Sequence, residues 1–254
     1  MIHVHGLEKT YHTGWAWWKT DIPVLKGFDF IAMPGEVTGI LGPNGAGKTT
    51  FFRILCGLEK ADAGKVMVDG LQPLVEPQSM RGRIALLPEE PGVNRDIAGR
   101  QHLWMFGAMM GMSAPQIVKA LRSCDELLDL SPFWTRRFAT YSRGQRARIA
   151  LARMNMMPDA SVFIFDEPSN GLDFEAVARL HGFIRHLARE GKTVLVTSHI
   201  LSDLQHVCNR LVGIDGGKAA TEERLTAWLV AHAKTQAGGP WLEQEQGQEE
   251  TVKP

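Results

Sequence analysis

The stretch that decides the fold is VTGILGPNGAGKTT, residues 37–50. Its first five residues form a short apolar run typical of a buried strand, and residues 49–56 have the pattern of a helix. The loop between them, residues 42–49, matches the phosphate-binding pattern GxxxxGK[ST] without a mismatch. Because this loop follows a strand and opens a helix, the sequence predicts a phosphate cradle here and not a chance glycine-rich turn.

The residue types of this loop suit a phosphate chain. Consecutive backbone N–H groups point inward and, with the helix N-terminus, form a concavity for anions. Gly45 and Gly47 permit backbone angles and a close approach that a Cβ atom would forbid. Lys48 supplies a positive charge for the β- and γ-phosphates, and the Thr49 hydroxyl is a candidate Mg²⁺ ligand. The candidate nucleotide-binding residues of the loop are Pro43, Asn44, Gly45, Ala46, Gly47, Lys48, Thr49 and Thr50.

A second stretch, VFIFDEPSNGLD at residues 162–173, places two carboxylates after an apolar strand. Open α/β sheets keep their ligand sites at the carboxyl ends of the strands. There Asp166 is expected to hold Mg²⁺ through its water shell, and Glu167 to orient and deprotonate an attacking water. A third strand, residues 193–197, is followed by Ser198 and His199, and the histidine can reach a γ-phosphate from that position.

The remaining chain repeats the alternation of short apolar runs with helical patterns, which predicts an α/β core with a largely parallel sheet. Further strands are expected at residues 65–68 and 84–87. Between residues 97 and 157 the strand-like runs vanish, so a mostly helical insertion is expected there. The tail from residue 238 is rich in glycine, glutamine and glutamate, which is typical of a mobile segment.

Composition excludes several classes of protein. The 254 residues are 44% hydrophobic and 22% charged, as in an ordinary globular protein. The 28 basic residues balance the 28 acidic ones, so no overall charge favours nucleic acid. The start shows no signal-peptide pattern, and the longest uncharged apolar run, residues 103–112, is too short to cross a bilayer. The cysteines Cys56, Cys124 and Cys208 are expected to be free thiols in a reducing compartment.

Residues 12–23, HTGWAWWKTDIP, hold three of the seven tryptophans. Trp15 and Trp17 alternate with small or polar neighbours, as in an edge hairpin with one apolar face. They can form a docking patch, since exposed aromatic residues often anchor interfaces. The alternative that we favour from the sequence is that they fold back onto the domain.

A serine, a glycine and a glutamine open a basic helix at residues 140–153, TYSRGQRARIALAR. Ser142 and Gln145 have the spacing of a capping box, in which the serine side chain accepts a backbone N–H bond and the glutamine reaches back. Capping alone explains a stable helix start. The stretch carries neither a nucleophile with its base nor a metal cluster.

Taken in order, six pieces of this sequence resemble the ATP-binding subunit of ATP-binding cassette (ABC) transporters. The resemblance runs from about residue 2 to about residue 225. It implies a P-loop NTPase (RecA-like) core at residues 1–96 and 158–225 with an antiparallel β edge subdomain. It also implies a helical signature subdomain at residues 97–157, and a C-terminal helix and tail at residues 226–254. The six pieces are Tyr11, GPNGAGKT, LPEE at residues 87–90, YSRGQ at residues 141–145, FDEP with SNGLD, and TSH at residues 197–199.

The resemblance implies ATP and Mg²⁺ as cofactors and a role for the helix start. In this family two subunits face each other head to tail. The signature sequence of each subunit, which is YSRGQ here, closes on the nucleotide held by the other. Glu167 and His199 would be catalytic, Asp173 would belong to the D-loop, and Tyr11 would stack on adenine. A core position for Tyr11, or competition from Trp15 or Trp17, is the alternative. The residues that would act across the interface are Ser142, Arg143, Gly144 and Gln145.

Two positions depart from the family pattern. Arg143 stands where the consensus has glycine, which places a cation beside the partner's triphosphate or turns it outward, and we expect the outward position. Glu89 stands where the Q-loop has glutamine after Pro88, and its carboxylate can still ligate Mg²⁺. This form, with TSHILSDL downstream, looks like the exporter-type (type-2) branch.

The implied partners are a second copy or a homologous ATPase subunit, and an integral membrane permease that keeps the chain at the cytoplasmic face of the membrane. No nucleic acid is expected. The permease would bind in the groove between the core and the helical insertion, near residues 89–101. Met105, Met109 and Met112 share a helical face there, although core packing is expected for most of them. A soluble ABC ATPase that powers an assembly or repair machine is the alternative function.

Overall fold

The computed structural model describes residues 1–15, 18, 20–88, 95–198 and 201–237. By their contacts the residues form two units, residues 1–219 and residues 220–254. The described part of the second unit contains one helix, α8 (Glu222–Ala237). Among the described residues, none of the helices is both long and apolar enough to span a membrane.

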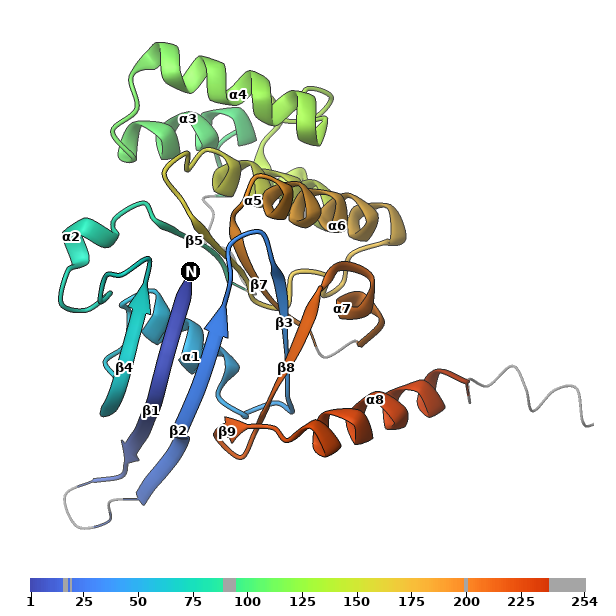
Figure 1. Cartoon of the computed structure of the whole chain (residues 1–254). Helices are drawn as coiled ribbons and strands as arrows, with labels where there is room; N and C mark the ends of the chain where they lie inside the picture. Colours follow the sequence, from blue (N-terminus) through green and yellow to red (C-terminus); the bar gives the residue numbers. More distant parts are fainter. Residues whose placement is uncertain (16–17, 19, 89–94, 199–200, 238–254) are drawn as a thin grey trace, which may run out of the picture. The chain divides into compact units, whose positions relative to one another are not determined.

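The first unit contains an antiparallel sheet of three strands, in the order β2-β1-β4 (Figure 1). The strands are β1 (Ile2–Thr13), β2 (Thr20–Ala32) and β4 (Ala63–Val68). Along β1 the buried residues Ile2 and Val4 alternate with exposed ones, because one face of the sheet packs on the core. The predicted antiparallel β part is therefore confirmed, and the predicted strand at residues 65–68 belongs to it.

The second sheet has six strands in the order β5-β6-β7-β3-β8-β9. The pairs from β5 through β6, β7 and β3 to β8 are all parallel, and β9 pairs antiparallel with β8. Every residue of β3, β6 and β7 is buried, as expected for strands covered on both faces. The predicted α/β fold with a mostly parallel sheet is confirmed. The strands are β3 (Val37–Leu41), β5 (Ile84–Leu87), β6 (Val162–Phe165), β7 (Thr193–Thr197), β8 (Arg210–Asp215) and β9 (Lys218–Ala219).

Helix α1 (Lys48–Leu55) packs within the hydrophobic core that the two sheets share. Phe51 lies with its ring centroid 5.1 Å from those of both Phe28 and Phe30 on β2. These edge-on contacts stabilise the start of α1 against the antiparallel sheet. The phosphate loop, residues 42–49, runs into the start of α1. It is therefore held by the core of the first unit.

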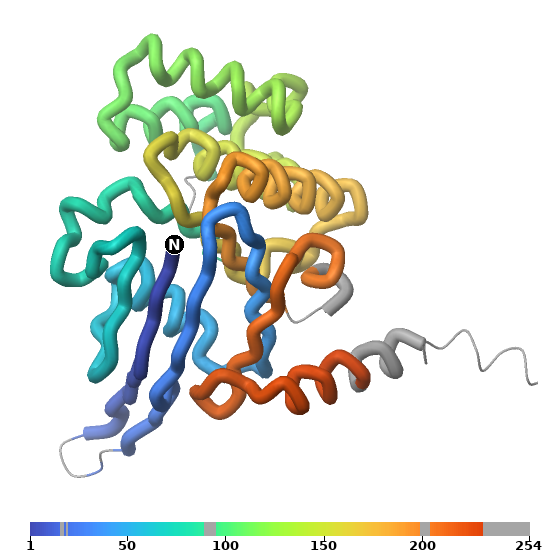
Figure 2. The backbone as a smooth tube through the Cα atoms, in the orientation of Figure 1, coloured from blue at the N-terminus to red at the C-terminus, as the bar shows by residue number. Residues whose placement is uncertain are grey.

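The stretch predicted to be helical contains α3 (Gly99–Met109), α4 (Ala114–Leu128), a 3₁₀ turn (Phe138–Thr140) and α5 (Arg143–Asn155). Figure 2 shows this part in green to yellow, with α3 and α4 in contact. The helical character of the stretch is confirmed, while the three-part division at residues 97 and 157 stays a prediction. Three further helices, α2 (Pro77–Met80), α6 (Phe174–Arg189) and α7 (Leu201–Val207), connect the strands.

Two expectations about aromatic and sulfur side chains are wrong. Trp15 is 90% exposed, so it does not fold back onto the domain, because it lies in the hairpin turn beyond the last strand pair, Thr13 with Thr20. Met105 and Met109 are exposed as well, because α3 packs through Leu103 and Gly107 on its other side. Trp17 lies outside the described residues.

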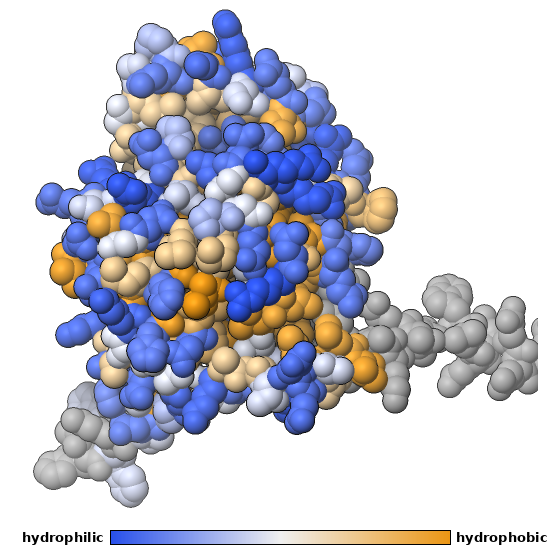
Figure 3. Space-filling view, in the orientation of Figure 1, coloured by the Kyte–Doolittle hydropathy of each residue, from blue (hydrophilic) through white to orange (hydrophobic). Residues whose placement is uncertain are grey.

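Hydrophilic side chains cover most of the face shown in Figure 3, and hydrophobic ones form small groups between them. The exposed apolar residues of the first unit include Ile22 and Ile31, both on β2. Single exposed apolar residues are normal for a protein surface. Ile22 and Ile31 therefore need no partner to explain their exposure.

Candidate functional site

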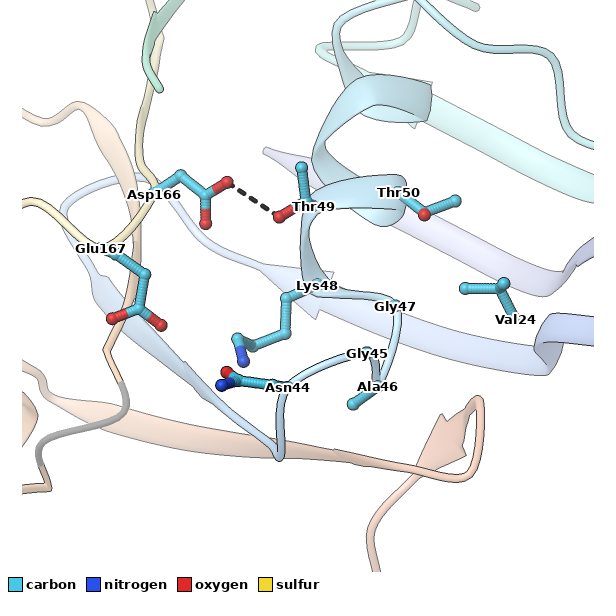
Figure 4. Close-up of a pocket in the computed structure, with 10 residues that line it drawn as sticks. All are labelled: Val24, Asn44, Gly45, Ala46, Gly47, Lys48, Thr49, Thr50, Asp166 and Glu167. Carbon is cyan, nitrogen blue, oxygen red and sulfur yellow. Dashed lines mark hydrogen bonds between the residues drawn. The ribbon is translucent and has the colours of Figure 1, made fainter. Parts of the chain in front are cut away.

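A cavity of about 290 Å³ lies where the phosphate loop meets the end of β6 (Figure 4). Gly45 and Gly47 have φ of +78° and +105°, in the region that favours glycine, as the sequence predicts. A Cβ atom on Gly47 would stand 3.0 Å from Val24, so the site also needs glycine for space. The lining residues are Val24, Asn44, Gly45, Ala46, Gly47, Lys48, Thr49, Thr50, Asp166 and Glu167.

The Lys48 side chain is buried beside the loop. Its ammonium donates to the carbonyl oxygens of Gly42, at 2.8 Å, and Pro43, at 3.3 Å. These two bonds use two of its three N–H donors. Among the described residues no carboxylate pairs with this buried ammonium, so it is an electrostatic site for an anion.

Asp166 is held by two hydroxyls from different elements. One carboxylate oxygen accepts from Thr49 on α1, at 3.0 Å, and the other accepts from Thr197 on β7, at 2.8 Å. Figure 4 shows Asp166 and Glu167 extending from the same end of β6 towards the loop. The structure thus brings together the phosphate loop and the predicted carboxylates.

Thr197 also fixes the backbone of the next carboxylate. Its hydroxyl oxygen accepts from the N–H of Glu167 at 2.9 Å. Glu167 has φ of +49°, a conformation that costs about 1 kcal/mol for a residue with a Cβ atom. A second bond, from Asn170 N–H to the Glu167 carbonyl at 3.2 Å, closes the turn that follows. The backbone is therefore held in the turn that brings the Glu167 side chain to the cavity.

The donor set fits ATP with Mg²⁺. Within the described residues no three His, Cys, Asp or Glu side chains gather closely enough to enclose a metal ion. Mg²⁺ in nucleotide sites is held by one or two protein oxygens, phosphates and waters. The Thr49 hydroxyl and the Asp166 carboxylate beside an anion cradle are such oxygens. Glu89, the third predicted Mg²⁺ ligand, and the predicted catalytic His199 lie outside the described residues.

The capping box at the start of α5 is confirmed. Ser142 Oγ accepts from the Gln145 N–H, and Gln145 Oε1 accepts from the Ser142 N–H, both at 3.2 Å. Gln145 Oε1 also accepts from the guanidinium of Arg136 at 3.0 Å. The lining of the 290 Å³ cavity does not include Ser142, Gly144 or Gln145. The signature residues thus lie outside this cavity, at a helix start where Ser142 and Arg143 are exposed and Gly144 and Gln145 are half-buried.

The other predicted elements lie beside this helix start. Arg143 is exposed, and its guanidinium lies across Gly171 of SNGLD in the same chain. Asp173 caps α6 by accepting from the N–H of Ala176 at 2.8 Å. A Cβ atom on Gly144 would stand 3.2 Å from the Ala176 side chain. The starts of α5 and α6 are therefore adjacent.

Tyr11 lies half-buried near the end of β1. Its hydroxyl is 3.5 Å from the hydroxyl of Thr50, which lines the cavity. The ammonium of Lys9 lies 5.3 Å from the centre of the Tyr11 ring. Tyr11 is thus a neighbour of the phosphate loop and not a member of the buried core.

Sequence reasoning missed Val24 and the role of Thr197. Val24 gives no motif signal, because only the pairing of β2 brings it to the loop. Thr197 gives a weak one, since it is a hydroxyl at the end of an apolar strand beside Ser198.

The three cysteines are free, and burial raises the pKa values of Cys56, Cys124 and Cys208 to about 12, 11 and 12. Such thiols are inert at neutral pH.

Comparison with known proteins identifies the family. Residues 25–170 match the family model described as "ABC transporter". The ABC transporter ATP-binding protein NatA of Bacillus subtilis (strain 168) is 34% identical over 72% of this chain and 75% of its own length. The Nod factor export ATP-binding protein I of Paraburkholderia xenovorans (strain LB400) is 35% identical over 82% of this chain and 68% of its own length.

A solved dimeric bacterial ABC transporter cassette has the same fold. It superposes with a TM-score of 0.77 at 23% identity and covers 87% of this chain and 97% of its own. A solved ATP-binding subunit of an ABC transporter gives 0.74 at 22% identity, over 91% of this chain and 99% of its own. The chain belongs to the ABC transporter family and is an ATP-binding ATPase cassette of it.

Proposed function

We propose that this chain hydrolyses ATP to drive a separate membrane permease of an exporter-type transporter. The observation that carries the proposal is the convergence of Lys48, Thr49, Asp166 and Glu167 on one cavity. These side chains supply an anion site, two oxygens for a cation, and a carboxylate for proton transfer. The name of the relative described as a Nod factor export ATP-binding protein supports the export direction.

In this proposal the phosphate chain of ATP lies along the loop from Pro43 to Thr50, with Lys48 at the β- and γ-phosphates. Thr49 and Asp166 would hold Mg²⁺, and Glu89 is a further candidate ligand. The ion, when bound, neutralises charge on the phosphate oxygens. The Thr49 hydroxyl oxygen lies 3.0 Å from an Asp166 oxygen, so the hydroxyl would bind the ion beside the carboxylate that holds its water shell.

Glu167 is the proposed general base. It takes a proton from the water whose oxygen attacks the γ-phosphorus, while the bond from that phosphorus to the bridging oxygen breaks and ADP leaves. The hydrogen bond from Glu167 N–H to Thr197 and the turn closed by Asn170 hold the backbone that carries this carboxylate. His199, which follows β7, would contact the γ-phosphate.

A complete site would need a second copy or a homologous subunit. Ser142, Arg143, Gly144 and Gln145 at the start of α5, with Asp173 at the start of α6, are proposed to contact the nucleotide of the partner. Three features support this arrangement. The two helix starts are adjacent, their residues Ser142, Arg143 and Asp173 are exposed, and a helix N-terminus favours an anion.

The proposed permease contact lies on the helical part of the chain, residues 97–157. Trp104, Met105 and Met109 are exposed on α3, at 39%, 52% and 74%. Beside α3 is a cavity of about 200 Å³, lined by residues of β5, α3 and α5 that include Phe106 and Arg153. Flexible methionine side chains suit an adaptable docking surface. Binding there would keep the chain at the cytoplasmic face of the membrane.

The experiment that tests the function compares Glu167→Gln with Glu190→Gln, an exposed control at the end of α6. Glu167→Gln is expected to retain ATP binding, lose turnover by at least about 100-fold, and accumulate as a dimer with ATP. Near-normal hydrolysis would remove this base from the mechanism. Co-purification with a multi-span membrane protein supports the transporter, whereas a purely soluble complex supports the alternative of an assembly or repair ATPase.

A further inference from the structure

A buried cation lies behind the ring of Tyr11. Lys9 is only 9% exposed, and its ammonium is 5.3 Å from the ring centre. This distance is within the range of a cation–π contact. Lys9 and Tyr11 are two residues apart on β1, so their side chains leave the same face of the strand.

Three oxygens of residues 59–62 hold the ammonium of Lys9 in place. It donates to the Lys60 carbonyl at 2.8 Å and pairs with the carboxylates of Glu59 at 2.9 Å and Asp62 at 3.5 Å. The bond to Glu59 is the main reason that the pKa of Lys9 is raised, so the amine is charged. Because these oxygens hold the Lys9 ammonium in place, the ammonium can fix the position of the Tyr11 ring.

The hydroxyl end of Tyr11 has its own neighbour. It lies 3.5 Å from the Thr50 hydroxyl, and Thr50 lines the cavity of the phosphate loop. The backbone next to the ring is also held, since the Thr10 N–H donates to the Asp62 carboxylate at 2.6 Å. The ring is therefore oriented at one face by a cation and at its tip by the loop helix.

We infer that Lys9 is a positioning residue that sets the Tyr11 ring as the platform for the base of the nucleotide. The inference rests on the proposed binding of ATP in the adjacent cavity. One face of the ring is turned to the ammonium, so stacking of the base would use the opposite face. The cation also draws the π electrons of the ring towards itself, which favours stacking on an electron-rich purine.

The test separates the base from the phosphates. Affinities for ATP and for inorganic tripolyphosphate, which has no base, are measured for the full chain and for Lys9→Met, Lys9→Arg, Tyr11→Ala and the double variant Lys9→Met/Tyr11→Ala. Lys9→Met is expected to weaken ATP about three- to fivefold and to leave tripolyphosphate unchanged. Lys9→Arg keeps the cation and is expected to bind ATP as tightly as the unmodified chain does. Lys26→Met, an exposed lysine on β2, is the matched control.

The double variant decides whether Lys9 acts through the ring. In the Tyr11→Ala background, Lys9→Met is expected to have no further effect on ATP. Equal weakening of ATP and tripolyphosphate, or the full Lys9→Met effect without Tyr11, would overturn the inference and leave Lys9 as a structural ion pair. If Lys9→Met does not fold, Asp62→Asn replaces it. Asp62→Asn is expected to lower the affinity for ATP by less than Lys9→Met and to leave the affinity for tripolyphosphate unchanged. An equal loss of affinity for both ligands would again overturn the inference.

The same measurements keep the two proposals apart. If the unmodified chain bound neither ligand, or if Lys48→Ala bound both as well as the unmodified chain does, the proposed ATP site itself would fail. If Lys48→Ala loses both ligands while Lys9→Met changes neither, only the role of Lys9 fails.

Discussion

The guanidinium of Arg143 lies over the backbone of Gly171 within one chain. A Cβ atom built on Gly171 would stand only 3.0 Å from the central carbon of that guanidinium. Gly171 also has φ of +69°, a conformation that favours glycine, whereas the flexible Arg143 side chain can move away from a Cβ atom. The contact joins the first residue of α5 to the loop before α6, and these are the two elements proposed to face the nucleotide of a partner chain.

Arg143→Gly, which restores the residue typical of the family, is expected to loosen this contact. ATP affinity of the single chain should not change, because Arg143 does not line the 290 Å³ cavity. ATP-dependent dimerisation in the Glu167→Gln background should weaken about fivefold, as the loop bearing Asp173 loses its cover. Sedimentation with ATP measures the dimer, and Arg143→Lys is the control that keeps the cation. Unchanged dimerisation would show that the contact has no role between chains.

Thr197→Val tests the hydroxyl that bonds the Asp166 carboxylate and the Glu167 backbone. It removes a donor to Asp166 and the acceptor of the Glu167 N–H. The buried groups left unpaired should lower the free energy of unfolding by about 1–3 kcal/mol. Turnover should fall roughly 10- to 100-fold, because Glu167 loses the contact that fixes its backbone.

Thr193→Val, at the other end of the same strand, is the matched control. Its hydroxyl is buried and has no hydrogen-bond partner among the described residues. Its removal should leave turnover unchanged and stability equal or higher, since no bond is lost. Equal loss of activity in both variants would mean that Thr197 acts only through the packing of β7.

Mixing two inactive chains tests whether one site is built from two copies. If sites are shared, a dimer of Glu167→Gln with Ser142→Arg contains one pocket with both lesions and one pocket with none. Random mixing in equal amounts should then restore about a quarter of the normal turnover, whereas each variant alone stays inactive. If each chain owned its whole site, the mixture would remain as inactive as its parts. The readout is steady-state ATP hydrolysis after co-refolding or co-expression.

The sequence carries the parts of this site that depend on neighbours along the chain. The buried strands at residues 37–41 and 162–165 follow from apolar runs, and the capping box of Ser142 and Gln145 follows from a spacing of three. Contacts between distant residues leave no such trace, and the position of Arg143 over Gly171 depends on how α5 packs beside α6. Periodicity placed three methionines on one helical face, but α3 ends at Met109, before Met112, and periodicity does not tell which face is buried. That choice is made by Gly107, whose missing side chain lets α3 approach Ile117 and Met156.

His102 should make the stability of the chain dependent on pH. It lies on α3 with its ring 6.4 Å from that of Phe138, and its Nε2 is buried without a hydrogen-bond partner among the described residues. Burial, and secondarily the charge of Arg153, lowers the pKa of His102 from 6.5 to about 4. Between pH 6.5 and pH 4 the unfolded chain therefore binds a proton at His102 that the folded chain does not bind. The contribution of His102 to the free energy of unfolding is fully present above pH 6.5 and is lost as the pH decreases towards 4.

Between pH 7.5 and pH 5, the shift predicts a loss of at most about 2 kcal/mol from this one group, because the side chain is only half-buried and solvent screening lowers the full value. Denaturant unfolding at the two pH values measures it. His102→Met, which fills the same apolar space without a titrating group, should flatten this part of the pH profile. His3→Gln, an exposed change on β1, should keep it. A profile that His102→Met leaves unaltered would assign the pH dependence to other groups, because an imidazole that titrates normally in the folded chain contributes nothing to it.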